Sequence, residues 1–371
     1  MRAENVAKIG QILQTYVKQK GAAGLIVVST PNLQTRWEKS STLPRGRQTQ
    51  RGKTERINRR CDYSNDLFNG KSRRDRCLTA KQWNLPKITE TYASTAPLNA
   101  FNFSANKKMN ISVAAKKEVT MTQNVVALWE GSDSQLKNEM VAVGAHYDHD
   151  GIRPNAQGAD KIWNGADDDG SGTVAVLAIG EALAKATKRP KRSVLLVWHA
   201  GEEKGLWGSK YFNKFPTVNI KNVVAQLNID MIGRSRKTTD TNPKNKSLSG
   251  EDEIYVIGSE MMSSKLGEVT KSINDSFLKL GYNYKYDDPK DTNQFFFRSD
   301  HYHYAVNGIP IVFWFDGEHE DYHQASDHAD KIDYRKMEKV SRTIFLTMWE
   351  IADLQTRPVV DKQLPAELTR R

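Results

Sequence analysis

Short, continuous apolar runs from residue 140 onward constrain the fold of this chain more than any other feature. They are rich in β-branched residues, which is typical of strands covered on both faces of a sheet. Predicted helices separate them, and this alternation predicts an α/β fold with a mostly parallel central sheet and helices on both faces. The predicted strands begin at Met140, Ser193, Asn222, Ile254 and Ile309, and the predicted helices at Thr173, Leu206, Ser263 and Tyr334.

Carboxylates and histidines stand where these strands end or where a helix begins. Open α/β sheets place their chemistry at the carboxyl ends of parallel strands, so we expect these side chains to meet at one edge. Carboxylate oxygen and imidazole nitrogen both bind zinc, and a catalytic zinc keeps three protein ligands so that water takes the fourth position. The sequence therefore predicts a metal centre. Its candidate residues are His146, Asp148, Asp167, Asp168, Asp169, Glu202, Glu203, Asp230, Asp321 and His323.

Taken singly, these residues have ordinary structural explanations. The acidic residues 167–169 precede a predicted helix, where capping and the helix dipole favour them. Adjacent glutamates such as Glu202 and Glu203 are usually solvated. Capping does not explain histidines at both ends of the series, however, and the joint occurrence favours the metal centre.

The number of candidate ligands bears on the number of metals. Five ligands give each of two metals three protein ligands only if one ligand is shared, and we expect a bridging aspartate within residues 167–169. Three ligand carboxylates against two dications leave the centre positive, which favours a metal-bound hydroxide near neutral pH. One glutamate of the adjacent pair can bind metal while its neighbour accepts the proton of that water.

Six motifs between about Gln123 and Leu354 resemble, in order and spacing, the M28 family of co-catalytic zinc aminopeptidases. The motifs are His146-Tyr-Asp148, Gly165-Ala-Asp-Asp-Asp-Gly-Ser-Gly172, Gly201-Glu-Glu-Lys-Gly-Leu-Trp-Gly-Ser209, Asp230-Met-Ile-Gly-Arg234, Ser299-Asp-His301, and Tyr322-His323 with Asp327. The resemblance implies two zinc ions per chain. By this likeness one ion is held by His146, Asp168 and Asp230, and the other by Asp168, Glu203 and His323.

The same resemblance implies roles for two further residues and a reaction. Glu202 is expected to be the general base, and Asp148 to orient His146 without binding the metal itself. The implied activity is that of an aminopeptidase, which hydrolyses the N-terminal peptide bond of peptides with a free N-terminus through a water between the metals. Substrates with an apolar first residue are expected to be preferred.

Three other functions compete with this one. A carboxypeptidase is the closest, because Arg234 and Arg298 flank motif residues and an arginine can pair with a substrate carboxylate. A glutaminyl cyclase-type transferase uses a similar site with a single zinc, but the full ligand set argues against it. The intact set also argues against a receptor-like relative that has lost catalysis.

Residues around the Ser299-Asp-His301 motif are expected to lie near the substrate. His301 and Arg298 are the candidates for substrate binding. Relatives often carry a tyrosine three residues before this motif, where its hydroxyl helps to polarise the scissile carbonyl, whereas this chain has Phe296. A phenyl ring cannot donate a hydrogen bond, so His301 or the metals alone are expected to serve in its place. The remaining histidines are expected to be structural: His149, His199, His303, His319 and His328.

The N-terminal part is expected to be separate from the catalytic domain at residues 121–356, which a C-terminal tail at 357–371 follows. Residues 1–120 weakly resemble part of a protease-associated domain. Within them, residues 34–76 are basic and without sustained periodicity, which is typical of an irregular segment. Cys61 and Cys77 lie there and could pair if the protein is exported.

Charge and hydropathy exclude some partners. The chain has a net charge of +11, but residues 36–76 hold 13 Lys and Arg against 5 Asp and Glu, and so account for +8 of it. That segment lacks the interleaved aromatic residues of a single-strand platform, so no nucleic-acid partner is expected. No apolar run has the ~18 residues of a membrane span. No export signal is visible at the start, although the family resemblance suggests a periplasmic or secreted protein.

Overall fold

The structure is a computed structural model that describes residues 119–364. The predicted protease-associated-like region, the basic segment 34–76, Cys61 and Cys77 lie outside the described residues, as do residues 365–371. The expectations for them, including a domain boundary near residue 120, stay predictions. No helix within residues 119–364 is long and apolar enough to cross a membrane.

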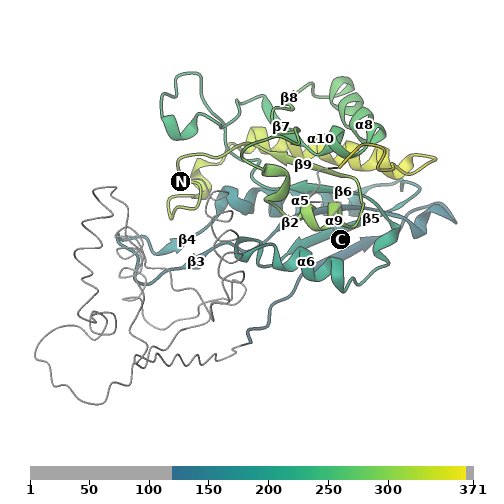
Figure 1. Cartoon of the computed structure of the whole chain (residues 1–371), viewed down its shortest axis with the longest axis horizontal. Helices are drawn as coiled ribbons and strands as arrows, with labels where there is room; N and C mark the ends of the chain where they lie inside the picture. Colours follow the sequence, from purple (N-terminus) through teal and green to yellow (C-terminus); the bar gives the residue numbers. More distant parts are fainter. Residues whose placement is uncertain (1–118, 365–371) are drawn as a thin grey trace, which may run out of the picture. The chain divides into compact units, whose positions relative to one another are not determined.

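A seven-stranded mixed sheet forms the centre of the described part, with the strand order β1-β5-β2-β6-β9-β7-β8 (Figure 1). Strands β5, β2, β6 and β9 are mutually parallel neighbours, whereas β1 and β7 run antiparallel to β5 and β9. The predicted α/β fold with a mostly parallel sheet is therefore confirmed. The strands are β1 (Val125–Trp129), β2 (Met140–His146), β5 (Ser193–His199), β6 (Val223–Ile229), β7 (Glu253–Ile257), β8 (Gly281–Asn283) and β9 (Ile311–Phe315).

The three central strands β5, β2 and β6 are buried along their whole length, which explains why the sequence shows them as continuous apolar runs. Helices α5, α8 and α10 pack on one face around Val143, Leu196 and Leu227. Helices α6, α7 and α9 lie on the other face, against Ala142, Leu195 and Phe313 (Figure 1). The helices are α5 (Gly172–Lys185), α6 (Trp207–Lys214), α7 (Ser259–Met262), α8 (Ser264–Ser276), α9 (His301–Val306) and α10 (Tyr334–Asp353).

Some elements are absent from the sequence prediction. Strand β1, Val125-Val-Ala-Leu-Trp129, is a continuous apolar run that the prediction did not include; it lies at the sheet edge, and its residues are half-buried or exposed. Helix α9 is only six residues long and is rich in aromatic residues and histidine. A two-stranded hairpin, β3 (Gly151–Ile152) with β4 (Ile162–Trp163), follows β2. These elements matter because β1, the hairpin and α9 all lie next to segments that carry site residues.

Candidate metal centre

The carboxyl ends of three neighbouring parallel strands bring the predicted ligands to one edge of the sheet. Strand β2 ends at His146, β6 is followed at once by Asp230, and β5 leads into the turn that carries Glu202 and Glu203. Asp168 reaches the same place from the segment before α5. His146, Asp168 and Asp230 are almost fully buried, with exposed fractions of 1%, 3% and 7%.

Asp168 lies between two histidines. Its Oδ1 lies 3.3 Å from His146 Nε2, and its Oδ2 lies 3.2 Å from His323 Nε2. Each oxygen of one carboxylate thus faces a different imidazole, as a shared ligand requires. We call the group of His146, Asp168 and Asp230 the first position, and the group of Asp168, Glu203 and His323 the second position.

Further distances complete the two positions. In the first position, His146 Nε2 lies 3.7 Å from Asp230 Oδ2, and the donor atoms of all three residues lie within 4.8 Å of one another. In the second position, His323 Nε2 lies 3.1 Å from Glu203 Oε2. Ligands arranged tetrahedrally around zinc at bond lengths of about 2.0 to 2.2 Å lie about 3.4 Å apart, so these separations match those of zinc donors.

The neighbouring aspartates have a different task from that of Asp168. The carboxylate of Asp169 accepts hydrogen bonds from the backbone N–H groups of His146, Gly172 and Met231, at 3.1, 3.0 and 3.1 Å. It therefore ties the ends of β2 and β6 to the start of α5. Asp167 accepts from the N–H of Gly233 at 2.7 Å. These bonds account for two acidic residues of the motif and leave Asp168 facing the histidines.

The turn with the two glutamates is held by Asp148. The N–H of Gly201 donates to both carboxylate oxygens of Asp148, at 2.7 and 2.9 Å, while Gly201 adopts a φ of 69° that suits glycine. The sequence assigned this side chain to orienting His146. Instead, it is the backbone carbonyl of Asp148 that accepts from Nδ1 of His146, at 3.0 Å. This bond needs the proton on Nδ1, so it leaves Nε2 as the ligand atom.

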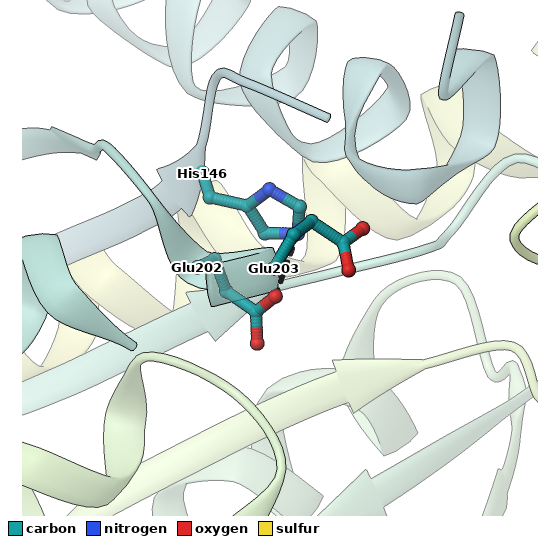
Figure 2. Close-up of side chains that lie close together, drawn as sticks. All are labelled: His146, Glu202 and Glu203. Carbon is teal, nitrogen blue, oxygen red and sulfur yellow. Dashed lines mark ion pairs between the residues drawn. The ribbon is translucent and has the colours of Figure 1, made fainter. Parts of the chain in front are cut away.

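The two glutamates point to different parts of the site (Figure 2). Glu202 Oε2 lies 4.0 Å from His146 Nε2 in the first position, whereas Glu203 contacts His323 in the second. Burial raises the pKa of Glu202 well above its usual range. Burial also acts to raise the pKa of Glu203, but its close contacts with His149 and His323 outweigh that effect and lower it. The different surroundings of the two adjacent carboxylates thus shift their pKa values in opposite directions.

Several buried polar atoms of this cluster lack a hydrogen-bond partner among the described residues: His146 Nε2, His149 Nδ1, Asp168 Oδ2 and Glu203 Oε1. Buried polar groups are almost always hydrogen-bonded, since an orphaned group costs about 1–3 kcal/mol. These orphaned atoms face one another and are of the nitrogen and oxygen types that bind zinc. The residues therefore fit a metal centre.

The sequence did not identify His149 as part of this cluster. Its Nδ1 lies 2.6 Å from Glu203 Oε1 and 3.9 Å from Asp168 Oδ2, and its ring is edge-on to that of His323. The only signal in the sequence was its position three residues after His146. Three other histidines contact different partners: His199 faces Tyr304, His319 faces Asp167, and His328 faces Asp160.

A cavity opens beside the cluster, and its lining includes both polar residues (Asp168, Glu202, Asp230 and His323) and aromatic ones (Phe295, Phe313 and Phe315). Arg298, a predicted substrate-binding residue, also lines it, and donates to Glu318 Oε1 at 2.7 Å and to the hydroxyl of Tyr322 at 3.2 Å. His301 does not line this cavity. It is fully buried, contacts the carbonyl oxygen of Phe296 through Nε2 at 2.7 Å, and burial lowers its pKa to about 3.

Comparison with known proteins identifies the family of this chain. The sequence model described as Peptidase family M28 matches residues 124–348, which is more than half of the chain. The chain therefore belongs to peptidase family M28, a family whose zinc aminopeptidases imply zinc as the metal here, and the predicted resemblance is confirmed.

Individual relatives cover the chain only in part. Leupeptin-inactivating enzyme 1 of Streptomyces exfoliatus is 34% identical over 113 residues, which are 30% of this chain and 22% of that protein. A probable leucine aminopeptidase of Arthroderma benhamiae is 27% identical over 58% of this chain and 54% of its own length. This chain thus spans about half, or less, of these relatives. Among solved structures, the aminopeptidase from Aneurinibacillus sp. strain AM-1 superimposes with a TM-score of 0.45 at 18% identity, over 65% of this chain and 49% of that one.

Proposed function

We propose that this protein is a zinc aminopeptidase that binds two zinc ions and removes the N-terminal residue of peptides. The observation that carries the proposal is the position of Asp168, whose two carboxylate oxygens face His146 and His323 at 3.3 and 3.2 Å. Asp230 completes the first position and Glu203 the second. When bound, the zinc ions supply Lewis acidity, which polarises the scissile carbonyl and lowers the pKa of water.

Glu202 is the proposed general base. It lies on the cavity wall beside the first position but has its own place in the turn, so it is available to take a proton from the attacking water. It can then return that proton to the leaving amine, because general acid and base roles alternate in such hydrolyses. Glu203 has the opposite environment, with two histidines nearby, and suits a ligand.

Charge in the cavity supports an aminopeptidase over a carboxypeptidase. A carboxypeptidase needs an arginine for the terminal carboxylate of its substrate. Arg298 already donates to Glu318, and the buried Arg234 donates to Asp321 Oδ2 at 2.9 Å. The acidic wall with Glu202 suits a free α-ammonium group instead. The aromatic rings that also line the cavity support a preference for apolar first residues.

Tyr322 is our candidate for the missing oxyanion donor. Phe296 is buried and edge-on to His301, whereas Tyr322 lines the cavity and its ring stacks on that of His323 with centroids 3.9 Å apart. Arg298 donates to the phenolic oxygen, which leaves the phenolic hydrogen for an acceptor in the cavity. Burial raises the pKa of Tyr322, so the phenol stays protonated near neutral pH and remains a donor.

The test compares one peptide in three forms: unblocked, N-acetylated and C-amidated, each incubated with the zinc-loaded full chain and analysed by mass. We expect stepwise loss of N-terminal residues from the unblocked and amidated forms and no change in the acetylated form. Protection by amidation alone would overturn the proposal in favour of a carboxypeptidase. A parallel peptide that begins with glutamine separates hydrolysis from cyclisation, because a cyclase would release ammonia and keep the chain length.

A further inference from the structure

We propose that His149 is a direct ligand of the second position, through Nδ1, so that this position has four protein donors: His149, Asp168, Glu203 and His323. This inference deepens the two-metal centre proposed above and rests on it. The second position would then have one protein donor more than the first, which has only His146, Asp168 and Asp230.

The first argument is the contact between His149 and Glu203. Nδ1 and Oε1 are 2.6 Å apart, yet neither atom has a hydrogen-bond partner within residues 119–364. A histidine that merely oriented Glu203 would show an aligned hydrogen bond at this separation. The contact is therefore not an aligned hydrogen bond, and binding of a cation by both atoms would move them from 2.6 Å to about 3.4 Å apart.

The ring of His149 lies close to the carboxylates of Asp168 and Glu203. The donor atoms of His149, Asp168 and Glu203 all lie within 4.8 Å of one another. His149 and His323 contact the same two carboxylates, with ring centroids 5.6 Å apart and an interplanar angle of 66°. His149 faces Oε1 of Glu203 and His323 faces Oε2, so both imidazoles approach the same carboxylates, and two imidazoles with two carboxylates are a donor set suited to zinc.

His149 also differs from the other histidines in its hydrogen bonding. Among the described histidines, it alone has both ring nitrogens buried and without a hydrogen-bond partner. By contrast, the buried His199 and His301 each direct Nε2 at a protein group. The backbone also makes room for this ring: Gly165 adopts a φ of 63°, and a Cβ there would lie 2.5 Å from Cγ of His149.

Two positions with different numbers of protein donors should bind zinc unequally. Four protein donors close a tetrahedral site, as in structural zinc sites, whereas three leave a place for water, as in catalytic ones. The second position is therefore expected to hold its ion more tightly and to retain it in half-loaded protein.

The test needs no activity measurement. The full chain is freed of metal, labelled with ¹⁵N-histidine and loaded with ¹¹³Cd, so that one-bond coupling identifies each ring nitrogen bound to the metal. We expect coupling to three histidines, with His149 coupled through Nδ1. Coupling to His146 and His323 alone would overturn the inference but leave the two-metal centre intact. Coupling to no histidine would contradict the proposed function itself.

Zinc affinity of variants provides the second measurement. In competition with a chromophoric chelator, His149→Gln should weaken the tighter of the two ions by more than about 100-fold, beyond the 10–100-fold typical of residues that only support a ligand. His328→Gln is the matched control, since His328 pairs with Asp160 outside the cluster, and it should bind both ions as the wild type does. Melting temperatures of the metal-free proteins check that both variants fold. A smaller loss in a folded His149→Gln variant would make His149 a positioning residue and overturn the inference.

Discussion

Charged residues are buried near both ends of strand β5, but their hydrogen bonding differs between the two ends. Immediately before the strand, Arg192 is 1% exposed, and its guanidinium donates to Glu139 Oε2 at 2.7 Å and to the carbonyl oxygen of Leu354. Just after the strand, Glu202 and Glu203 enter a cluster in which several buried donors and acceptors have no partner.

The difference separates charge that supports the fold from charge that is available for chemistry. Breaking a buried ion pair is costly, so a structural charge is found with its hydrogen bonds made. Orphaned buried atoms are tolerated at the other end because a ligand can satisfy them, and a ligand that binds only the folded state also stabilises it. Substitutions after the strand should therefore change mainly activity, and a substitution before it should change mainly stability.

The largest effect is expected from Asp168→Asn, which weakens the shared donor of both positions. We expect kcat/KM to fall by at least about 10³-fold, because the metals supply several kcal/mol of transition-state stabilisation. Elemental analysis after dialysis should find fewer than two zinc ions per chain. Full zinc content together with near wild-type activity would show that Asp168 is not a bridging ligand.

Glu202→Gln should come next. The amide preserves shape and hydrogen bonding but cannot accept a proton, so kcat should fall by roughly 10²-fold or more, the range of general-base loss. Zinc content should stay near that of the wild type. Glu203→Ala is the paired variant and should lose metal instead; if the two phenotypes are exchanged, the roles assigned to the two glutamates are reversed.

Arg192→Met tests the opposite end of the strand. Removing the cation takes a hydrogen-bond donor from the Leu354 carbonyl and from Glu139, which among the described residues keeps only Arg357 at 3.6 Å, so the free energy of unfolding should fall by about 2 kcal/mol. Urea denaturation measures this loss. Metal content and kcat of the folded protein should change little, because Arg192 lies at the far end of β5. A variant of full stability but low activity would reverse the comparison.

The smallest effect concerns Asp287, a partly buried carboxylate that accepts from the N–H groups of Gly258 and Glu260. Burial raises its pKa to about 6. Because the folded-state pKa lies above the unfolded value of about 3.9, its stabilising contribution is complete below pH ~3.9 and is lost as pH rises through about 6.

Comparison with Asp287→Asn isolates this titration from that of the metal centre. The free energy of unfolding of the wild type, relative to the variant, should fall by about 1–2 kcal/mol between pH ~4.5 and ~7. Denaturation curves at several pH values measure it. A difference that is constant over this range, or that grows with pH, would contradict the raised pKa.

Hydrophobic patterning predicted the sheet where strands are covered on both faces and failed where they are not. Strands β2, β5 and β6 are continuous apolar runs because helices cover both sides. Strand β1 was missed although Val125–Trp129 is also a continuous apolar run; at the sheet edge its residues are half-buried or exposed, so its apolar character does not indicate burial. The antiparallel direction of β7 could not be predicted either, since apolar composition carries no information on strand direction.

For the site, residue type and chain position together predicted which side chains gather, but not which atoms meet. His146, Glu203 and Asp230 could be predicted because each stands just after a buried strand. The carboxylate of Asp148, which holds Gly201 rather than His146, could not be, because this depends on the path of the loop after β2.

The sequence by itself determined the fold class, the family and the edge of the sheet where the ligands lie, because these depend on the order of apolar runs and polar residues along the chain. Only the tertiary structure decided that His149 faces Glu203, that Tyr322 rather than Phe296 reaches the cavity, and that Arg234 and Arg298 are already paired. These outcomes depend on contacts between residues far apart in sequence and on side-chain directions in loops. A pattern of residue types along the chain does not encode either of these.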